Sequence, residues 1–150
     1  MKKILFSFFL ILLFSSSVFA EWKYLGEHSD KKISFYIDTI NIKQIDNDIF
    51  SYTMLEDYGI ELVLGTGVLS SINDEQIDCK NKKFRKRHSI FFTENMGAGE
   101  QFYVMDLEGF KSRGFHIWYQ IDKDGKDTWQ NGTEVDSELP LIIHNLICTS

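Results

Sequence analysis

A run of basic residues beside a cysteine is the part of this 150-residue sequence whose side chains could do chemistry. Six of the sixteen basic residues lie within residues 80–87. If residues 82–93 form a strand, Lys83, Arg85 and Arg87 share one face at a spacing of about 6.6 Å. Arginine presents a planar fork of donors to an oxyanion. This row therefore predicts salt-sensitive binding to sulfated sugars, lipid phosphates or acidic protein loops.

The same row has an alternative explanation within the chain. The preceding predicted strand, Val68 to Asp78, carries three acids, Asp74, Glu75 and Asp78, and opposite charges across neighbouring strands are common. Lysines also protect edge strands from aggregation. The second face of the basic strand is expected to turn apolar and reach the core, and it carries these side chains: Lys82, Phe84, Lys86, His88, Ile90 and Phe92. The residues leave partner binding and internal charge balance both open.

Cys79 and Cys148 are the two cysteines of the chain, 69 positions apart. An even cysteine count in an exported protein indicates a disulfide, which would close a loop worth about 4 kcal/mol in the chain-entropy account. The alternatives are two free thiols or a metal site. The absence of a CxxC pair or of nearby histidines argues against zinc.

Other candidate sites are weaker. The segment Asp122–Asp127 resembles a calcium loop, but Thr133 stands where an EF-hand requires glutamate, so a hairpin turn at Asp124-Gly125 is expected. The four histidines are scattered, and the serines lack the glycine-flanked turn of a hydrolase nucleophile. We therefore expect no catalytic residues, no metal and no cofactor, with a small hydrolase as a minor alternative.

The three tryptophans, Trp22, Trp118 and Trp129, are expected to pack against the sheet. Were Trp118 to lie exposed beside the row of cations, the two together would form a sugar-stacking surface.

The first twenty residues have the features of a secretory signal peptide. Two lysines precede an apolar core at Ile4–Phe14, and Val18-Phe19-Ala20 fits the cleavage pattern. The core is shorter than the roughly 20 apolar residues of a membrane span, and no cysteine near the cleavage site suggests a lipid anchor. We expect a signal peptide at 1–20 and one exported domain at 21–150, located in the periplasm or at the cell surface.

The charge of the exported part limits the class of partner. Residues 21–150 contain 14 basic and 22 acidic residues, a net charge of −8. Nucleic-acid binding usually requires an excess of Lys and Arg over a whole face. The basic run is an island in an acidic chain, so a protein or sulfated-glycan partner is expected and nucleic acid is not.

Strand patterns dominate the exported part. Aromatic and β-branched residues are abundant, and Pro140 is the single proline. The C-terminus instead shows helical spacing at Leu139, Ile142, Ile143, Leu146 and Ile147, with Asp136 or Ser137 as cap and the end near Ile147. The predicted class is α+β, an antiparallel sheet of about six strands with one C-terminal helix. The predicted strands are Trp22–Gly26, Ile33–Asp38, Ile49–Tyr58, Val68–Asp78, Lys82–Thr93, Gln101–Leu107 and Phe115–Asp122.

The order of these features resembles the surface-adhesin protein E family, small exported proteins of Gram-negative bacteria. The matching residues are Trp22, Tyr36-Ile37-Asp38, Asp57-Tyr58, Asp78-Cys79 with the basic residues after it, Gly97-Ala98-Gly99-Glu100, Trp129 and Cys148. The resemblance implies a sheet of about six strands held to a C-terminal helix by a Cys79–Cys148 disulfide. For the founding member it also implies adhesion to host extracellular-matrix and serum glycoproteins.

Three departures from the family pattern bear on function. The segment Leu107–Thr128 resembles an extra hairpin, Glu134–Ser137 replaces the family's Pro-Gly-Ser, and no lipid-anchoring cysteine is evident. Two functions remain open: an adhesin-like protein that binds an anionic partner through Lys83, Arg85 and Arg87, and a periplasmic structural or inhibitory module with an envelope-protein partner.

Overall fold

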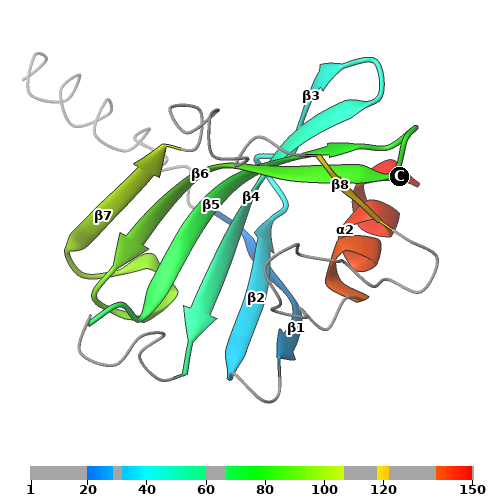
Figure 1. Cartoon of the computed structure of the whole chain (residues 1–150). Helices are drawn as coiled ribbons and strands as arrows, with labels where there is room; N and C mark the ends of the chain where they lie inside the picture. The colour runs from blue at the N-terminus through cyan, green and yellow to red at the C-terminus, as the bar shows by residue number, and fades with distance from the viewer. Residues whose placement is uncertain (1–19, 29–31, 60–66, 107–117, 122–137, 150) are drawn as a thin grey trace, which may run out of the picture.

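The computed structural model describes residues 20–28, 32–59, 67–106, 118–121 and 138–149, with the backbone alone for 103–106. Within these residues eight strands form one antiparallel sheet with the order β1-β2-β4-β5-β6-β7; β3 pairs with β4, and β8 pairs with the start of β6 (Figure 1). The elements are β1 (Trp22–His28), β2 (Ile33–Asp38), β3 (Lys43–Asp46), β4 (Ile49–Tyr58), β5 (Ser70–Asp78), β6 (Lys83–Phe92), the 3-10 turn η1 (Asn95–Gly97), β7 (Gln101–Asp106), β8 (Tyr119–Gln120) and α2 (Glu138–Cys148).

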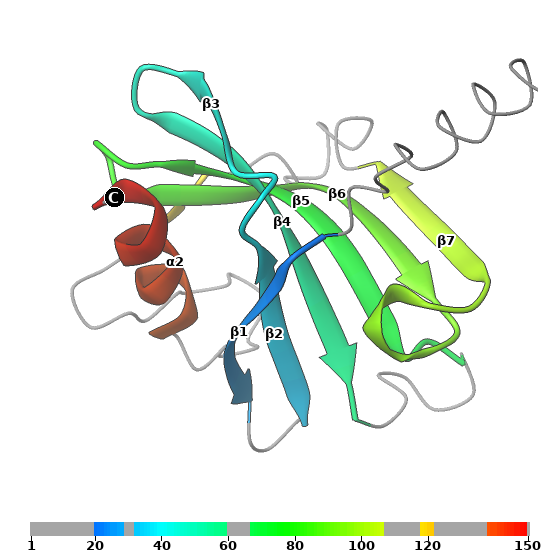
Figure 2. The ribbon, with the colours of Figure 1, turned by 180° about the vertical axis from the view of Figure 1, so that it is seen from behind.

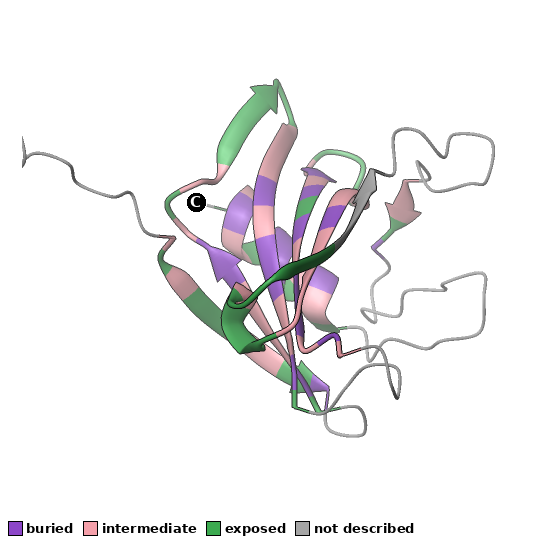
Figure 3. Cartoon of the chain, turned by 90° about the vertical axis from the view of Figure 1, so that its left-hand side faces the viewer, coloured by how far each residue is buried: buried purple, intermediate pink, exposed green. Residues whose placement is uncertain are grey.

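The predicted architecture of an antiparallel sheet with a C-terminal helix is confirmed. The central path has the expected six strands, and two of them, at 33–38 and 49–58, have the predicted bounds. The short strand β3 was not predicted, because all four of its side chains are exposed and leave no apolar alternation to read (Figure 3). Several predictions lie outside the described residues: the signal segment up to residue 19, the Asp122–Asp127 turn, Trp129 and the helix caps.

The helix α2 packs against one face of the curved sheet, which we call the inner face (Figures 1 and 2). Ile37, Met54 and Ile77 of the sheet meet Ile143 and Ile147 of the helix in the main hydrophobic cluster. The opposite face, which we call the outer face, carries the alternate residues of the same strands.

One prediction for the helix needs correction. Ile142 was expected in the buried stripe but is 38% exposed, because the helix turns Ile143 and His144 inward instead. The helix ends at Cys148, close to the expected end near Ile147. Cys148 therefore reaches the sheet from the last helical turn.

A disulfide joins Cys79 to Cys148 across 69 positions, as predicted. Cys79 lies directly after β5, so the bond ties the end of α2 to the β5–β6 connection. His144 adds a polar contact, with its Nε2 at 3.3 Å from the carbonyl oxygen of Cys79. The C-terminal helix is thus attached to the connection that leads into the basic strand.

The basic strand β6 contains a bulge that changes which residues face the core. Asp74 pairs with His88 and Glu75 pairs with Lys86, so Arg87 is an extra residue on β6. Before the bulge Phe84 and Lys86 point to the inner face, and after it Ser89 and Phe91 do. The prediction that His88, Ile90 and Phe92 share a face with Phe84 is wrong, because strict alternation does not survive an inserted residue.

Lys82 and Lys86, both predicted for the inner face, have different positions. Lys82 lies in the exposed turn before β6. Lys86 does point inward, where its Nζ lies 2.9 Å from Glu56 Oε1 and 3.8 Å from Glu75 Oε1. Opposite charges therefore meet on the inner side of the strand.

Hydroxyl groups complete this inner ionic cluster. The Tyr52 hydroxyl donates to Glu75 Oε2 at 2.8 Å, and the Tyr58 hydroxyl donates to Glu56 Oε2 at 2.9 Å. Ser71 also donates to Glu56 Oε2, at 3.3 Å. Two carboxylates thus share one ammonium group and are each stabilised by a tyrosine.

This environment shifts the pKa values of the two carboxyl groups in opposite directions. Burial, together with the nearby charge of Glu56, raises the pKa of Glu75 above its ordinary value of 4.5 despite the attraction of Lys86. Burial would also raise the pKa of Glu56, but the charge of the closer Lys86 lowers it instead. Three hydrogen bonds add to this effect, one from the Lys86 ammonium group and one each from the hydroxyls of Tyr58 and Ser71. Burial alone would lower the pKa of Lys86, and the two carboxylates raise it.

We predict that removal of the disulfide weakens the folded state by about 4 kcal/mol, because a crosslink over 69 positions restricts the unfolded chain. The test is urea denaturation of the variant with Cys79→Ser and Cys148→Ser beside the oxidised protein. Reduction of the unmodified protein should give the same loss. An unchanged unfolding midpoint in both experiments contradicts this prediction.

We predict that Glu75→Gln stabilises the protein at neutral pH and leaves it nearly unchanged at pH 4. Because the folded-state pKa of Glu75 is raised, the stability linked to its proton is fully present below pH 4.5 and is lost as the pH rises through the folded value. Each tenfold difference in proton affinity between the folded and unfolded chains corresponds to about 1.4 kcal/mol.

Glu56→Gln is the matched control, since it alters the other carboxyl on the same ammonium. Its pKa is lowered, so its contribution is present above pH 4.5 and lost as the pH falls through the folded value. This variant should be less stable than the unmodified protein at pH 7. Urea unfolding at several pH values measures both, and equal effects of the two substitutions at pH 7 are incompatible with the prediction.

Candidate functional site

The three predicted binding residues lie on the outer face of the sheet, but their surroundings differ. Lys83 pairs in register with Asp78 on β5 and with Gln120 on β8. Burial would raise the pKa of Asp78, yet hydrogen bonds from Asn81 and Lys80 and the charge of Lys83 lower it. Part of the Lys83 charge is therefore balanced within the chain.

Arg85 and Arg87 meet at a neutral group instead. Arg85 donates to Gln76 Oε1 from Nε at 2.8 Å and from Nη2 at 2.6 Å, and Arg87 donates to the same oxygen from Nη1 at 3.4 Å. An amide oxygen orients the two guanidinium groups without cancelling their charge. Partial burial and, after it, the neighbouring charge of Arg87 lower the pKa of Arg85.

The sugar-stacking arrangement expected of Trp118 takes a modified form. Trp118 lies beside the row of cations, but it is half-buried, whereas a sugar-stacking surface would require it to be exposed. The guanidinium carbon of Arg85 lies over its ring, 4.5 Å from the centroid. The indole face therefore holds Arg85 in place by a cation–π contact.

The predicted internal partners of the basic strand are found for some cations and not for others. Glu75 meets Lys86 on the inner face, Asp78 lies opposite Lys83, and Asp74 Oδ2 lies 3.8 Å from His88 Nδ1. Arg85 and Arg87 hydrogen-bond to Gln76 rather than to these acids. Internal charge balance thus accounts for Lys86 and part of Lys83. The arginine pair, which converges on the neutral Gln76, is the strongest candidate for an external anion.

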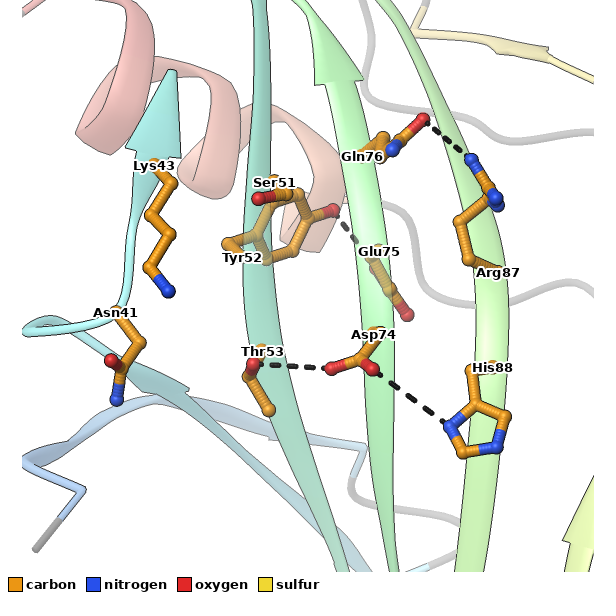
Figure 4. A pocket seen from close by; sticks show the side chains of 10 residues that line it. All are labelled: Asn41, Lys43, Ser51, Tyr52, Thr53, Asp74, Glu75, Gln76, Arg87 and His88. Atoms are coloured by element: carbon orange, nitrogen blue, oxygen red, sulfur yellow. Dashed lines mark hydrogen bonds and ion pairs between the residues drawn. The ribbon is translucent and has the colours of Figure 1, made fainter. Parts of the chain in front are cut away.

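A groove of about 790 Å³ crosses the outer face beside this pair (Figure 4). Its floor contains Ser51 and Thr53 of β4 with Asp74 and Gln76 of β5, and Arg87 and His88 line it from β6. Asn41 and Lys43 line it from the direction of β3 (Figure 4). Thr53 donates its hydroxyl to Asp74 Oδ1 at 3.3 Å.

Sequence reasoning missed most of this groove. Ser51, Thr53 and Gln76 are ordinary strand residues, and only the register places them beside Arg85 and His88: Ser51 pairs with Gln76, and Gln76 with Arg85. His88 was placed on the wrong face because the bulge was not foreseen. The alternation of β4 and β5 could have identified the floor residues, but no pattern pointed to Lys43 on the exposed β3.

The site combines groups that suit an anion. It offers guanidinium, ammonium, hydroxyl and amide groups, which match an oxyanion and its polar surroundings. In the described parts of the chain, no helix combines the length and the apolar character of a membrane-crossing segment.

The chain is similar to known proteins at the level of the family. The family profile of surface-adhesin protein E matches residues 22–133. Crystal form II of Haemophilus influenzae protein E is 15% identical, with a TM-score of 0.44 over 77% of this chain and 80% of that chain. The selenomethionine form of the same protein is 18% identical, with a TM-score of 0.38 over 55% of this chain and 73% of that chain. No curated protein matches the chain.

The match to the family profile spans most of the sequence and includes nearly all of the described sheet. It confirms the resemblance that Trp22, the Asp78-Cys79 step and the spacing of the cysteines predicted. The chain belongs to the surface-adhesin protein E family.

Proposed function

We propose that the protein is an exported, non-enzymatic binding protein that contacts an anionic partner through the outer face of β6. The observation that carries this proposal is the convergence of Arg85 and Arg87 on the single neutral oxygen of Gln76. Two like charges that converge on one neutral oxygen are attracted to an external anion that can approach them both. Membership of an adhesin family supports a binding role and display at the cell surface.

Lys83 is a secondary member of this surface. Its position on the same face extends the row of cations, but Asp78 opposes it. Partners of suitable chemistry are sulfated glycans and acidic protein surfaces, and their binding should weaken as salt screens the exposed charges. A partner of this kind also explains why the cations are grouped in a chain of opposite net charge.

We predict that Arg85→Gln with Arg87→Gln releases the protein from both sulfated dextran and poly-glutamate at lower salt than the unmodified protein. Lys83→Gln should have a smaller effect, because Asp78 already offsets part of its charge. The control is Lys23→Gln with Lys32→Gln, which removes the same charge from exposed positions on β1 and before β2.

Salt-gradient elution from the two matrices measures these effects, and thermal unfolding checks that each variant folds. If the arginine variant folds and elutes with the unmodified protein from both matrices, the surface is wrongly assigned. Equal losses in the arginine and control variants would mean that net charge alone determines retention.

We predict that the chain expressed in a Gram-negative cell loses residues 1–20 and becomes accessible to protease added to intact cells. The basis is the charged start, the apolar core and the Ala20 cleavage pattern, together with the adhesin family. Mass spectrometry of the mature chain should give Glu21 as the first residue. Full protection from protease in intact cells, with digestion after outer-membrane permeabilisation, would instead favour the periplasmic alternative.

A further inference from the structure

The groove beside the arginine pair contains hydrogen-bonding groups of several kinds. Ser51 and Thr53 contribute hydroxyls, Gln76 an amide and Asp74 a carboxylate, and Asn41 lies at one end (Figure 4). Cations line it from two directions, Lys43 near β3 and Arg87 on β6. None of the residues that line it is aliphatic. Its two rings are the imidazole of His88 and the phenol of Tyr52, and Tyr52 directs its hydroxyl to Glu75 in the inner cluster.

We propose that this groove is a binding site for an anionic glycan, and that Lys43 and Asp74 help to select it. The inference rests on the proposed function and names the class of partner for the same surface. It adds residues from β3, β4 and β5 to a site that sequence reasoning had confined to β6.

The lack of apolar side chains argues for a sugar and against a protein loop. Protein–protein contacts derive most of their affinity from aromatic and other large side chains seated in dry pockets. The groove is open and polar and offers no such pocket. A glycan instead presents many hydroxyls, which donate to and accept from side chains of this kind, and its sulfate or carboxylate groups match the arginine fork.

Asp74 distinguishes a sugar from an acidic peptide. Its carboxylate already accepts from Thr53 and lies 3.8 Å from His88. With a side chain 60% exposed, it has lone pairs available to further donors. A sugar hydroxyl can donate to this carboxylate, whereas an acidic peptide carries only acceptors on its charged groups and is repelled by it.

Lys43 extends the site from β6 to β3. It stands on the exposed strand β3, pairs with Ser51 in register and lines the groove from a different strand from Arg87. A ligand that meets both cations must cross β4 and β5, and an extended chain with repeated anionic groups meets this requirement. A single small anion at the arginine pair does not involve Lys43.

The test compares three probes on the intact protein: a sulfated dextran oligosaccharide, the unsulfated oligosaccharide of equal length, and poly-glutamate of matched charge. We expect the sulfated sugar to bind most tightly. Lys43→Gln should weaken it about three- to fivefold, the effect of one exposed ion pair. Lys23→Gln, on the exposed part of β1, is the matched control and should leave it unchanged.

Asp74→Ala separates the glycan from an acidic protein. It should weaken binding of the sulfated oligosaccharide, because the charged acceptor that a hydroxyl loses contributes more than the exposed repulsion between Asp74 and the sulfates. It should strengthen binding of poly-glutamate, which loses only a repulsive charge. Calorimetric titration of each folded variant measures both affinities.

Two outcomes would overturn the inference. One is that Lys43→Gln and Asp74→Ala both bind the sulfated oligosaccharide as the unmodified protein does, while the arginine variant still loses it. The other is that poly-glutamate binds as tightly as the sulfated sugar and Asp74→Ala strengthens both, which would assign the groove to an acidic protein partner. In either case the proposed function stands, since it fails only when the arginine variant loses neither ligand.

Discussion

The ion pair between Lys86 and Glu56, with Glu75 beside it, is the constraint on which the two faces of β6 depend. A shift of one residue in a strand turns every side chain to the opposite face. Here such a shift would remove the ammonium from two buried carboxylates, and loss of one partner of a buried ion pair typically costs about 3–5 kcal/mol. Lys86 thereby fixes the register of β6, and the bulge at Arg87 then sets Arg85, Arg87 and His88 on the outer face.

Other contacts hold the surroundings of the strand. The disulfide ties α2 to the connection before β6, and η1 after it docks on β4 and β5. Asp57 Oδ1 accepts from Asn95 Nδ2 at 2.9 Å and from the Met96 N–H at 2.8 Å. Gly97 lies so close to the sheet that an added Cβ would stand 2.8 Å from Ile72. A rigid support on both sides keeps side chains at the fixed separations that recognition requires.

Much of this fold could be predicted from the sequence, because apolar alternation and helical spacing record burial directly. The bounds of β2 and β4 follow from such patterns, and the cysteine pairing follows from an even cysteine count behind a signal segment. The faces of β6 beyond Lys86 could not be predicted, since an inserted residue leaves no mark in composition. The groove could not be predicted for a related reason. Only the pairing of the strands brings Lys43 and Gln76 to the same groove as the arginine pair.

The position of Gln76 explains how an acidic chain can maintain a cationic surface. A glutamate at this position would form ion pairs with Arg85 and Arg87 and offset their charge, whereas the amide of Gln76 orients both groups as a neutral acceptor. On the inner face negative charge is in excess, because two carboxylates share the one ammonium group of Lys86. The side chains of adjacent strand residues point to opposite faces. Arg85 and Arg87 can therefore lie on the outer face while Lys86, between them, lies on the inner face. Around the middle of β6, negative charge is in excess on the inner face and the two arginines lie on the outer face, and this local separation favours the approach of an anion to the arginine pair.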